Sequence, residues 1–561
     1  MSDLDLVSPG CINGFETKNR IIMAPMTRSR SLPGGVPSEL ADGTSIVEPI
    51  PGQSSRTRRG GEMRNLSVPC GLILALAVGA QAQTPNKCSE LTKFRIPGVT
   101  MAIARAETIP ASDSAPSHCQ ADGVIDQRNG AGGKTYGIGF AIALPDAWNN
   151  RFLFQGGGGY NGSVRPPLGA AGAGNEPGLA RGFAVVSTDT GHKGATFDTT
   201  FNVDQQASLD FAQVAVGRVT EIAKQIVAHY YGQGARYSYF AGCSTGGREA
   251  MLMTQRYPAY FDGVVSGDPA MRTGFSQIGN NWAAVAFNQI APKDEAGRAQ
   301  PDKIFSDADK KLIVKGILDA CDGNDGLRDG MVFNTRACKF DPEMLTCSGA
   351  KTDACLTSQQ AAALKKAFAG PRNSKGDLVY PLNAYDAGIA NLLPSSLPRA
   401  AGAPAPPLSI DVDQRLFSIL SNPLEALTDS TWTNLSSFSA HGGKLLFYHG
   451  MSDQAFSAMD TLDYYLKMSK ANGGMDQVQN WSRLYLVPGM YHCRGGEFAL
   501  DNFDLLSAVV NWVEKGTAPD SVVATGKAFP GRSRPLCAYP KYAYYKGQGD
   551  PQDAKNFECR E

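Results

Sequence analysis

Ten of the chain's twelve cysteines lie beyond Gln83, and two of them adjoin residues with the chemistry of a nucleophile and a base. Cys243 directly precedes Ser244, and Cys493 directly follows His492. A disulfide between the two would hold a serine beside a histidine that is 248 positions away. This pattern predicts a serine hydrolase whose active site is closed by a disulfide.

An even set of ten cysteines in an exported chain indicates a disulfide framework. Short separations favour four pairs: Cys88–Cys119, Cys321–Cys338, Cys347–Cys355 and Cys537–Cys559. This leaves Cys243 and Cys493 for each other, although the sequence alone leaves the connectivity open. A zinc site is the alternative, but the chain contains no Cys-x2-Cys pair.

The segment 63–82 has the layout of a secretory signal peptide. Met63-Arg64 is basic, the run from Leu66 to Ala80 is apolar, and Ala80-Gln-Ala82 is a small-x-small cleavage site. The alternative is a buried core helix. We therefore expect a secreted or periplasmic protein, and the absence of 18 consecutive apolar residues predicts no membrane span.

Residues 1–62 look foreign to the rest of the chain. The stretch from Asn19 to Arg30 resembles the first-strand segment of the old yellow enzyme family, in which Ala24–Thr27 would line the flavin. The resemblance covers only a small part of a barrel that needs about 250 residues. We expect a disordered or loosely attached extension and no organic cofactor, with a flavin oxidoreductase fusion as a remote alternative.

The alternation of strand and helix patterns predicts an α/β fold with a mostly parallel sheet. Apolar segments typical of strands lie at 136–144, 151–155, 183–187, 237–240, 263–266, 444–448 and 484–488. Helical periodicity covers 210–231, 245–256, 460–471 and 505–514. We expect a catalytic domain from 83–268 and 431–561, with a lid domain at 269–430 inserted between two sheet strands.

Ser244 is the candidate nucleophile. It lies in Gly242-Cys-Ser-Thr-Gly246, a G-x-S-x-G motif with a strand before it and a helix after it. The first N–H groups of that helix would face a developing oxyanion. The glycine run 156–159 ends an early strand, where a second oxyanion donor is expected, although it also fits a flexible loop.

His492 is the candidate base because it follows a late strand, and His192 is the alternative. Asp453 is the candidate acid, since it follows a strand and precedes the histidine in α/β-hydrolase order. Asp460 and Asp463 fit a helix start better. The acid would hold the imidazole tautomer and stabilise the imidazolium.

An acidic loop packs Asp322, Asp325 and Asp329 into eight residues between Cys321 and Cys338. Carboxylates this close repel one another unless a hard cation lies among them. The spacing does not match an EF-hand. A solvated acidic loop is the alternative to a disulfide-bracketed calcium site.

Three motifs together resemble the tannase and feruloyl esterase family over residues 86–561. They are Gly242-Cys-Ser-Thr-Gly-Gly247, His449-Gly-Met-Ser-Asp453 and Val487-Pro-Gly-Met-Tyr-His-Cys493. The resemblance implies an α/β-hydrolase fold with a large lid, a triad of Ser244, Asp453 and His492, and a Cys243–Cys493 disulfide.

The same resemblance implies further site residues. The oxyanion donors would be the Thr245 N–H and one glycine, Gly157 or Gly158. A structural Ca²⁺ would take its ligands from Asp322, Asp325, the Leu327 carbonyl, Asp329 and the Met331 carbonyl. Arg399 and Arg415 are candidates for an arginine that binds a substrate carboxylate.

These features predict a secreted serine carboxylesterase for small aromatic acid esters. Feruloyl esters come first and galloyl esters second, with a mono(2-hydroxyethyl) terephthalate hydrolase-like activity as a further alternative. The substrate would be free or attached to plant polysaccharide or tannin. Zero formal net charge argues against nucleic acid and membrane partners. A non-catalytic binding module is a remote alternative.

Overall fold

The computed structural model describes residues 10–12, 15–17, 86–113, 115–381, 383–395 and 405–561. The chain divides into two compact units, Met1–Gln81 and Ala82–Glu561. In the first unit, β1 (Gly10–Ile12) pairs antiparallel with β2 (Phe15–Thr17). The flavin-like segment 24–27 and the signal segment 63–82 lie outside the described residues and stay predictions.

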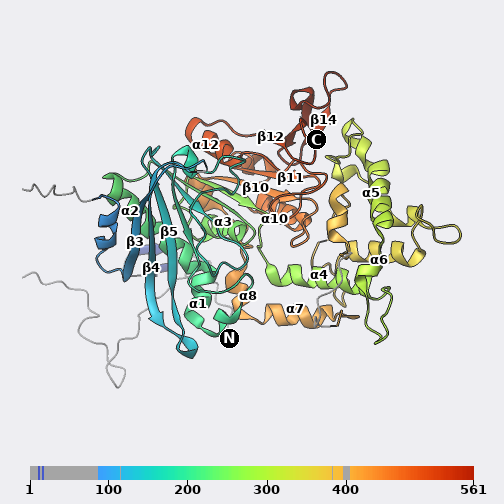
Figure 1. Ribbon diagram of the computed structural model, residues 1–561, viewed down its shortest axis with the longest axis horizontal. Coiled ribbons are helices and arrows are strands. Elements are labelled where there is room, and N and C mark those ends of the chain that lie inside the picture. The colour runs from blue at the N-terminus through green and yellow to red at the C-terminus, as the bar shows by residue number, and fades with distance from the viewer. Residues whose placement is uncertain (1–9, 13–14, 18–85, 114, 382, 396–404) are drawn as a thin grey trace, which may run out of the picture. The chain divides into compact units, whose positions relative to one another are not determined.

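A nine-stranded mixed sheet organises the second unit, in the order β11-β10-β9-β8-β6-β7-β5-β4-β3 (Figure 1). Its strands are β3 (Met101–Ile109), β4 (His118–Asn129), β5 (Thr135–Pro145), β6 (Arg151–Gln155), β7 (Ala184–Thr188), β8 (Tyr237–Cys243), β9 (Gly263–Gly267), β10 (Lys444–Gly450) and β11 (Ser482–Val487). Strands β6 to β11 are parallel, as the sequence predicts. The antiparallel extension β3–β4 was not predicted, because β3 alternates poorly between buried and exposed positions.

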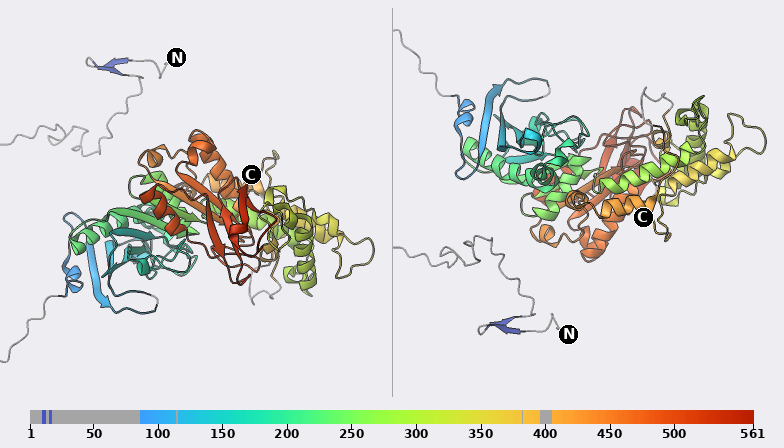
Figure 2. Two further views of the ribbon diagram at one scale, coloured as in Figure 1. Left: turned by 90° about the horizontal axis from the view of Figure 1, so that it is seen from above. Right: turned by 90° about the horizontal axis from the view of Figure 1, so that it is seen from below.

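Helices cover both faces of the parallel part of the sheet, which explains why strands β6 to β11 are largely buried. Two apolar cores lie on opposite faces of the sheet, and alternate residues of β6 pack into each. Phe152 and Phe154 face one core, and Leu153 faces the other. The first core includes α2 (Ala215–Tyr231), α3 (Thr245–Arg256) and α10 (Ala458–Ala471), and the second includes α12 (Leu505–Lys515) (Figures 1 and 2). The predicted helix 210–231 begins earlier, as α1 (Gln205–Leu209) and a π-helical turn (Asp210–Val214) that lead into α2.

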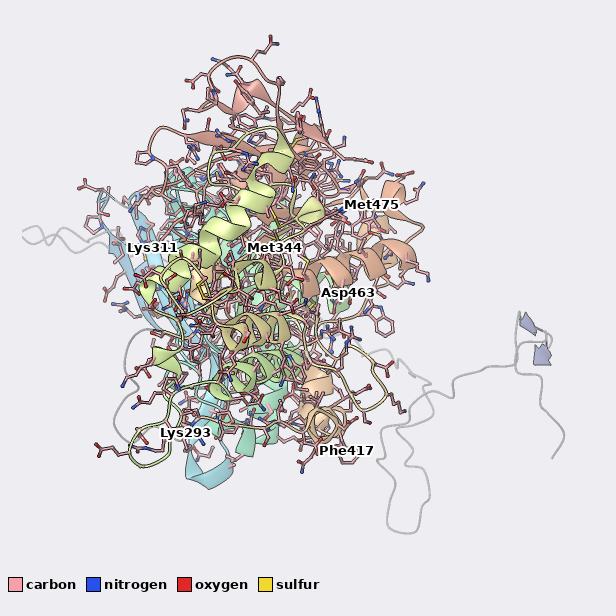
Figure 3. All side chains as sticks on the ribbon, turned by 90° about the vertical axis from the view of Figure 1, so that its right-hand side faces the viewer. Lys293, Lys311, Met344, Phe417, Asp463 and Met475 are labelled. Atoms are coloured by element: carbon pink, nitrogen blue, oxygen red, sulfur yellow. A yellow bond between two sulfur atoms is a disulfide. The ribbon has the colours of Figure 1, made fainter. Side chains whose placement is uncertain are left out.

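A largely helical insertion separates β9 from β10. Its helices are α4 (Thr273–Asn288), α5 (Asp307–Cys321), α6 (Ser358–Phe368), α7 (Val412–Leu420), α8 (Pro423–Thr428) and α9 (Ser436–Ala440). The insertion has its own apolar core, which includes Phe287, Ile313 and Leu364. Figure 3 views the molecule from this side, where the exposed Met344 and Phe417 belong to the insertion. Its function as a lid stays a prediction.

The C-terminal part adds α11 (Met475–Val478) and two small antiparallel pairs. These are β12 (Ser521–Thr525) with β13 (Ser533–Cys537), and β14 (Tyr542–Tyr545) with β15 (Phe557–Arg560). Five disulfides are present: Cys88–Cys119, Cys243–Cys493, Cys321–Cys338, Cys347–Cys355 and Cys537–Cys559. These are the pairs that sequence spacing favours. Within the described residues, no helix is both long and apolar enough to cross a membrane.

Phe154→Ala should destabilise the protein by about 3–5 kcal/mol, because it empties a fully buried site between two aromatic rings. Phe154 stacks on Phe240 at 5.1 Å and meets Phe261 edge-on at 6.5 Å. Urea unfolding followed by fluorescence measures the change. Val523→Ala, at a position of β12 that is 58% exposed, is the control; equal midpoints for the two variants would contradict the packing assigned to β6.

Candidate active site

Ser244 occupies a sharp turn between β8 and α3. Its backbone has φ 64° and ψ −122°, a strained conformation for a residue with a side chain. The glycines around it allow the chain to pass closely, since a Cβ atom on Gly246 would lie 2.7 Å from the Gly157 carbonyl oxygen. This is the geometry of a nucleophile elbow, in which the serine hydroxyl is presented at the end of the strand.

His492 and Asp453 meet at the ends of two neighbouring parallel strands. Asp453 follows β10 and His492 follows β11, and the His492 Nδ1 lies 2.7 Å from the Asp453 Oδ2. The other carboxylate oxygen accepts hydrogen bonds from the N–H groups of Ala455 (2.6 Å) and Phe456 (3.2 Å). Because an ionised carboxylate only accepts, Nδ1 carries the proton and Nε2 is left as the basic nitrogen.

Electrostatics favour the charged forms of this pair. Burial raises the pKa of Asp453, but hydrogen bonds from His449 and His492 outweigh it and hold that pKa well below its ordinary value. Burial lowers the pKa of His492, and the Asp453 carboxylate more than reverses this, so the net shift is upward. Asp453 therefore stabilises an imidazolium at His492, which a proton-shuttling base requires.

The Cys243–Cys493 disulfide joins the serine turn to the histidine loop. It spans 250 positions of sequence and brings the two Cα atoms to 6.0 Å. Ser244 and His492 are the immediate chain neighbours of its two cysteines. The loop after β11 is thereby covalently fixed to the carboxyl end of β8.

Two further buried residues lie beside the acid: His449 contacts it, and Asp268 contacts His449. The His449 Nε2 lies 3.3 Å from the Asp453 Oδ2, 3.8 Å from the Asp268 Oδ1 and 3.1 Å from the Phe456 carbonyl. Burial raises the pKa of Asp268 to about 7, with the charge of Asp453 adding to the shift and His449 opposing it. Sequence reasoning missed Asp268. Its position just after β9, at the same sheet edge as Asp453, was the available signal.

The other residues considered as base or acid are engaged elsewhere. His192 stacks on Phe201 with ring centroids 3.7 Å apart, and burial lowers its pKa to about 4. Asp460 pairs with Arg272, and Asp463 pairs with Lys467 at 2.6 Å. Among the described histidines, His492 and His449 are the two that contact the Asp453 carboxylate.

The structure separates the two glycines considered as oxyanion donors. The Gly157 N–H donates to the Glu249 carboxylate at 2.9 Å, so it is already engaged. Within the described part of the chain, the Gly158 N–H has no acceptor. Thr245 begins α3, and its N–H belongs to the unpaired first turn. Gly157 is therefore an unsuitable donor, and Thr245 and Gly158 remain the candidates.

The acidic loop buries two of its three carboxylates among backbone donors. Asp322 accepts from the N–H groups of Asp329 and Gly330, and Asp325 accepts from that of Phe333. Burial, with the neighbouring carboxylates, raises the pKa of Asp325 to about 7. Asp329 instead pairs with Arg534.

Two buried carboxylates beside backbone carbonyls suit a hard cation. Asp322 and Asp325 are buried, and their oxygens accept hydrogen bonds from backbone N–H groups; a Ca²⁺ site that they form with the Leu327 and Met331 carbonyls stays a prediction. The ion pair with Arg534 turns the Asp329 carboxylate toward a cationic side chain.

Asp386 connects the insertion to the loop of Asp453 and to the loop of His492. This fully buried residue accepts hydrogen bonds at one oxygen from the Ser452 hydroxyl (2.6 Å) and the Gly489 N–H (2.7 Å). Ser452 precedes the acid, and Gly489 lies three positions before His492. Of the two arginines considered for a substrate carboxylate, Arg415 is exposed on α7 and Arg399 lies outside the described residues.

The family model for tannase and feruloyl esterase matches residues 119–391 and 409–560. The chain belongs to the tannase and feruloyl esterase family. Membership makes it a carboxylic ester hydrolase with an α/β-hydrolase fold.

Individual relatives agree with this assignment. The mono(2-hydroxyethyl) terephthalate hydrolase of Piscinibacter sakaiensis is 38% identical, over 82% of this chain and 88% of that protein. A probable feruloyl esterase of Arthroderma benhamiae is 28% identical, over 88% and 97%. The crystal structure of feruloyl esterase B from Aspergillus oryzae superposes with a TM-score of 0.69 at 24% identity, over 84% of this chain and 99% of that one.

Removing the disulfide with Cys243→Ala/Cys493→Ala should lower kcat on any ester substrate by about 100-fold, because misplacing a reacting group by about 1 Å costs that much. Cys347→Ala/Cys355→Ala removes a disulfide of the insertion that spans only 8 positions, and it serves as the control. Steady-state kinetics with both variants measure the effect. Near-normal kcat in the first variant would show that the covalent link is not what aligns the serine and the histidine.

Proposed function

We propose that the protein is a secreted or periplasmic serine esterase that hydrolyses aromatic acid esters, with feruloyl esters preferred. Ser244 is the nucleophile, His492 the base and Asp453 the acid that orients it. The contact of 2.7 Å between Asp453 and His492, beside a strained serine turn, carries the proposal. The five disulfides support an oxidising compartment.

The mechanism has two half-reactions. The His492 Nε2 takes the Ser244 proton as the hydroxyl oxygen attacks the ester carbonyl, and it returns the proton to the departing alcohol. Water, deprotonated by the same nitrogen, then cleaves the acyl-serine and releases the acid. The N–H groups of Thr245 and Gly158 stabilise the oxyanion in both steps.

A cavity of about 150 Å³ beside Thr245 suits an aromatic acyl group. The rings of Tyr160, Phe201 and Phe211 line it, and the insertion contributes Leu424. Ala270, which also lines it, donates its N–H to the Ser244 carbonyl at 3.1 Å, so the cavity lies beside the turn that carries Ser244. Aromatic walls favour a flat acyl ring through offset or edge contacts.

Two related substrate classes are alternatives. The relative that is 38% identical is named for mono(2-hydroxyethyl) terephthalate, which is also an aromatic acid ester. Galloyl esters follow from the tannases of the family. In each class the aromatic acid would be esterified to a small alcohol, a plant polysaccharide or a tannin.

Purified protein should hydrolyse at least one of methyl ferulate, methyl gallate and mono(2-hydroxyethyl) terephthalate, while Ser244→Ala should lose activity by at least about 10⁴-fold. Initial rates by liquid chromatography measure this, and the fastest ester identifies the acyl preference. Labelling with a fluorophosphonate checks that the serine is reactive. A labelled protein that cleaves none of the three esters would retain the esterase mechanism and refute the aromatic specificity.

The acidic loop should bind Ca²⁺ and thereby stabilise the fold. Asp322, Asp325 and the carbonyls of Leu327 and Met331 would hold the ion, whose charge offsets the burial of the carboxylates. Treatment with EGTA should lower the Tm by several degrees, and Ca²⁺ should restore it better than Mg²⁺. Scanning calorimetry with metal analysis tests this. An unchanged Tm and no bound calcium would leave the loop as a solvated acidic turn.

A further inference from the structure

Glu249 is a fully buried carboxylate that the proposed mechanism does not use. It lies in α3, five positions after Ser244, and its side chain is 0% exposed. Its two oxygens accept hydrogen bonds from the Gly157 N–H (2.9 Å) and from the Asn161 Nδ2 (2.7 Å). Both donors belong to the loop that follows β6, so one carboxylate holds that loop through two hydrogen bonds.

The adjacent arginine does not neutralise this carboxylate directly. Arg248 is also buried, but its guanidinium donates to the carbonyls of Phe211, Ala212 and Thr428. Among the described residues, Glu249 makes no ion pair within 4.0 Å. Burial consequently raises its pKa, with Arg248 acting in the opposite direction. A buried carboxylate that accepts hydrogen bonds only from neutral donors carries a desolvation cost.

The loop and the helix meet through backbone as well. The Tyr160 N–H donates to the Thr245 Oγ1 at 3.2 Å, and a Cβ atom on Gly156 would lie 2.7 Å from the Gly246 Cα. The Glu249 contacts therefore fix a loop that already touches the first turn of α3. That first turn carries the Thr245 N–H, and the loop carries the Gly158 N–H.

We propose that Glu249 is the positioning residue of the oxyanion hole. The inference rests on the proposed esterase function. By fixing the Gly157 N–H and the Asn161 amide, Glu249 sets the course of the chain between them. Gly158 lies between the two points that Glu249 holds, and its carbonyl accepts from the Asn161 N–H at 3.0 Å, so this closed turn restrains the direction of the Gly158 N–H. Glu249 thus couples the two oxyanion donors without contacting substrate.

The test compares Glu249→Ala with Glu249→Gln. Alanine removes both acceptors and should lower kcat by about 100-fold, which is the effect of losing one oxyanion donor, with KM changing less than threefold. Glutamine should recover most of kcat. Its amide oxygen can accept from the Gly157 N–H, and rotation of the Asn161 amide presents Oδ1, which has no partner among the described residues, to the new NH₂.

A boronic acid inhibitor distinguishes positioning from stability. It forms a tetrahedral adduct with the serine, so its Ki should rise with the fall in kcat/KM if the oxyanion hole is disturbed. Glu514→Gln is the matched control, because Glu514 is a carboxylate of α12 that accepts from Arg151 and Tyr239 in the other core. It should change Tm without changing kcat or Ki. Asn161→Ala, which removes one donor to Glu249, provides a milder variant if alanine at 249 fails to fold.

The outcomes separate this inference from the proposed function. All variants are assayed on p-nitrophenyl acetate, which any serine esterase of this design cleaves, as well as on methyl ferulate. If the wild-type protein is active and Glu249→Ala leaves kcat and Ki unchanged, the inference is wrong and the proposed function stands. A parallel loss in the alanine and glutamine variants, with lowered Tm and an unchanged Ki, also overturns it. Wild-type protein inactive on both esters overturns the function and the inference together.

Discussion

One covalent bond, between Cys243 and Cys493, joins the two sides of the proposed active site. Hydrogen bonds fix the histidine to its acid, since His492 and Asp453 follow adjacent strands and contact each other at 2.7 Å. The serine follows β8, which is separated from β11 by two strands. The disulfide spans that separation beside the proposed catalytic residues. Because the serine and the histidine both lie on loops, this link limits how far the base can move from the nucleophile.

Parallel pairing places the remaining chemistry. The carboxyl ends of β8, β9, β10 and β11 lie at one sheet edge, and they are followed by Ser244, Asp268, Asp453 and His492 in that order. This topology therefore brings together polar residues from four segments that are distant in sequence, each at the end of its own strand. The insertion enters between β9 and β10, at the same edge, and Asp386 ties it to the loops of the acid and the base.

Much of this arrangement could be predicted from the sequence, because it depends on local patterns. Strong apolar runs indicated the parallel strands, and short separations indicated four disulfides, which left Cys243 and Cys493 to pair. Chain order pointed to Asp453, whose carboxylate lies 2.7 Å from His492. The antiparallel strand β3 was missed because its burial alternates weakly, and the helix before α2 was missed because its π-helical turn breaks the 3.6 periodicity. Asp268 and the choice between Gly157 and Gly158 depend on which atoms meet after folding, so no spacing rule reveals them.

Three buried carboxylates that do not react, Asp268, Glu249 and Asp386, surround the proposed triad. Each accepts a hydrogen bond from a backbone N–H group of the site: Gly450 at the end of β10 for the first, Gly157 in the loop after β6 for the second and Gly489 in the loop after β11 for the third. An apolar side chain could fill the same space at lower desolvation cost, but it could not fix the direction of a peptide N–H. Burial raises the pKa of all three carboxylates, which is the cost of holding them there. Burial of these carboxylates thus lowers stability, but it holds the loop donors and side chains in one orientation. A site that stabilises a transition state requires such fixed donors.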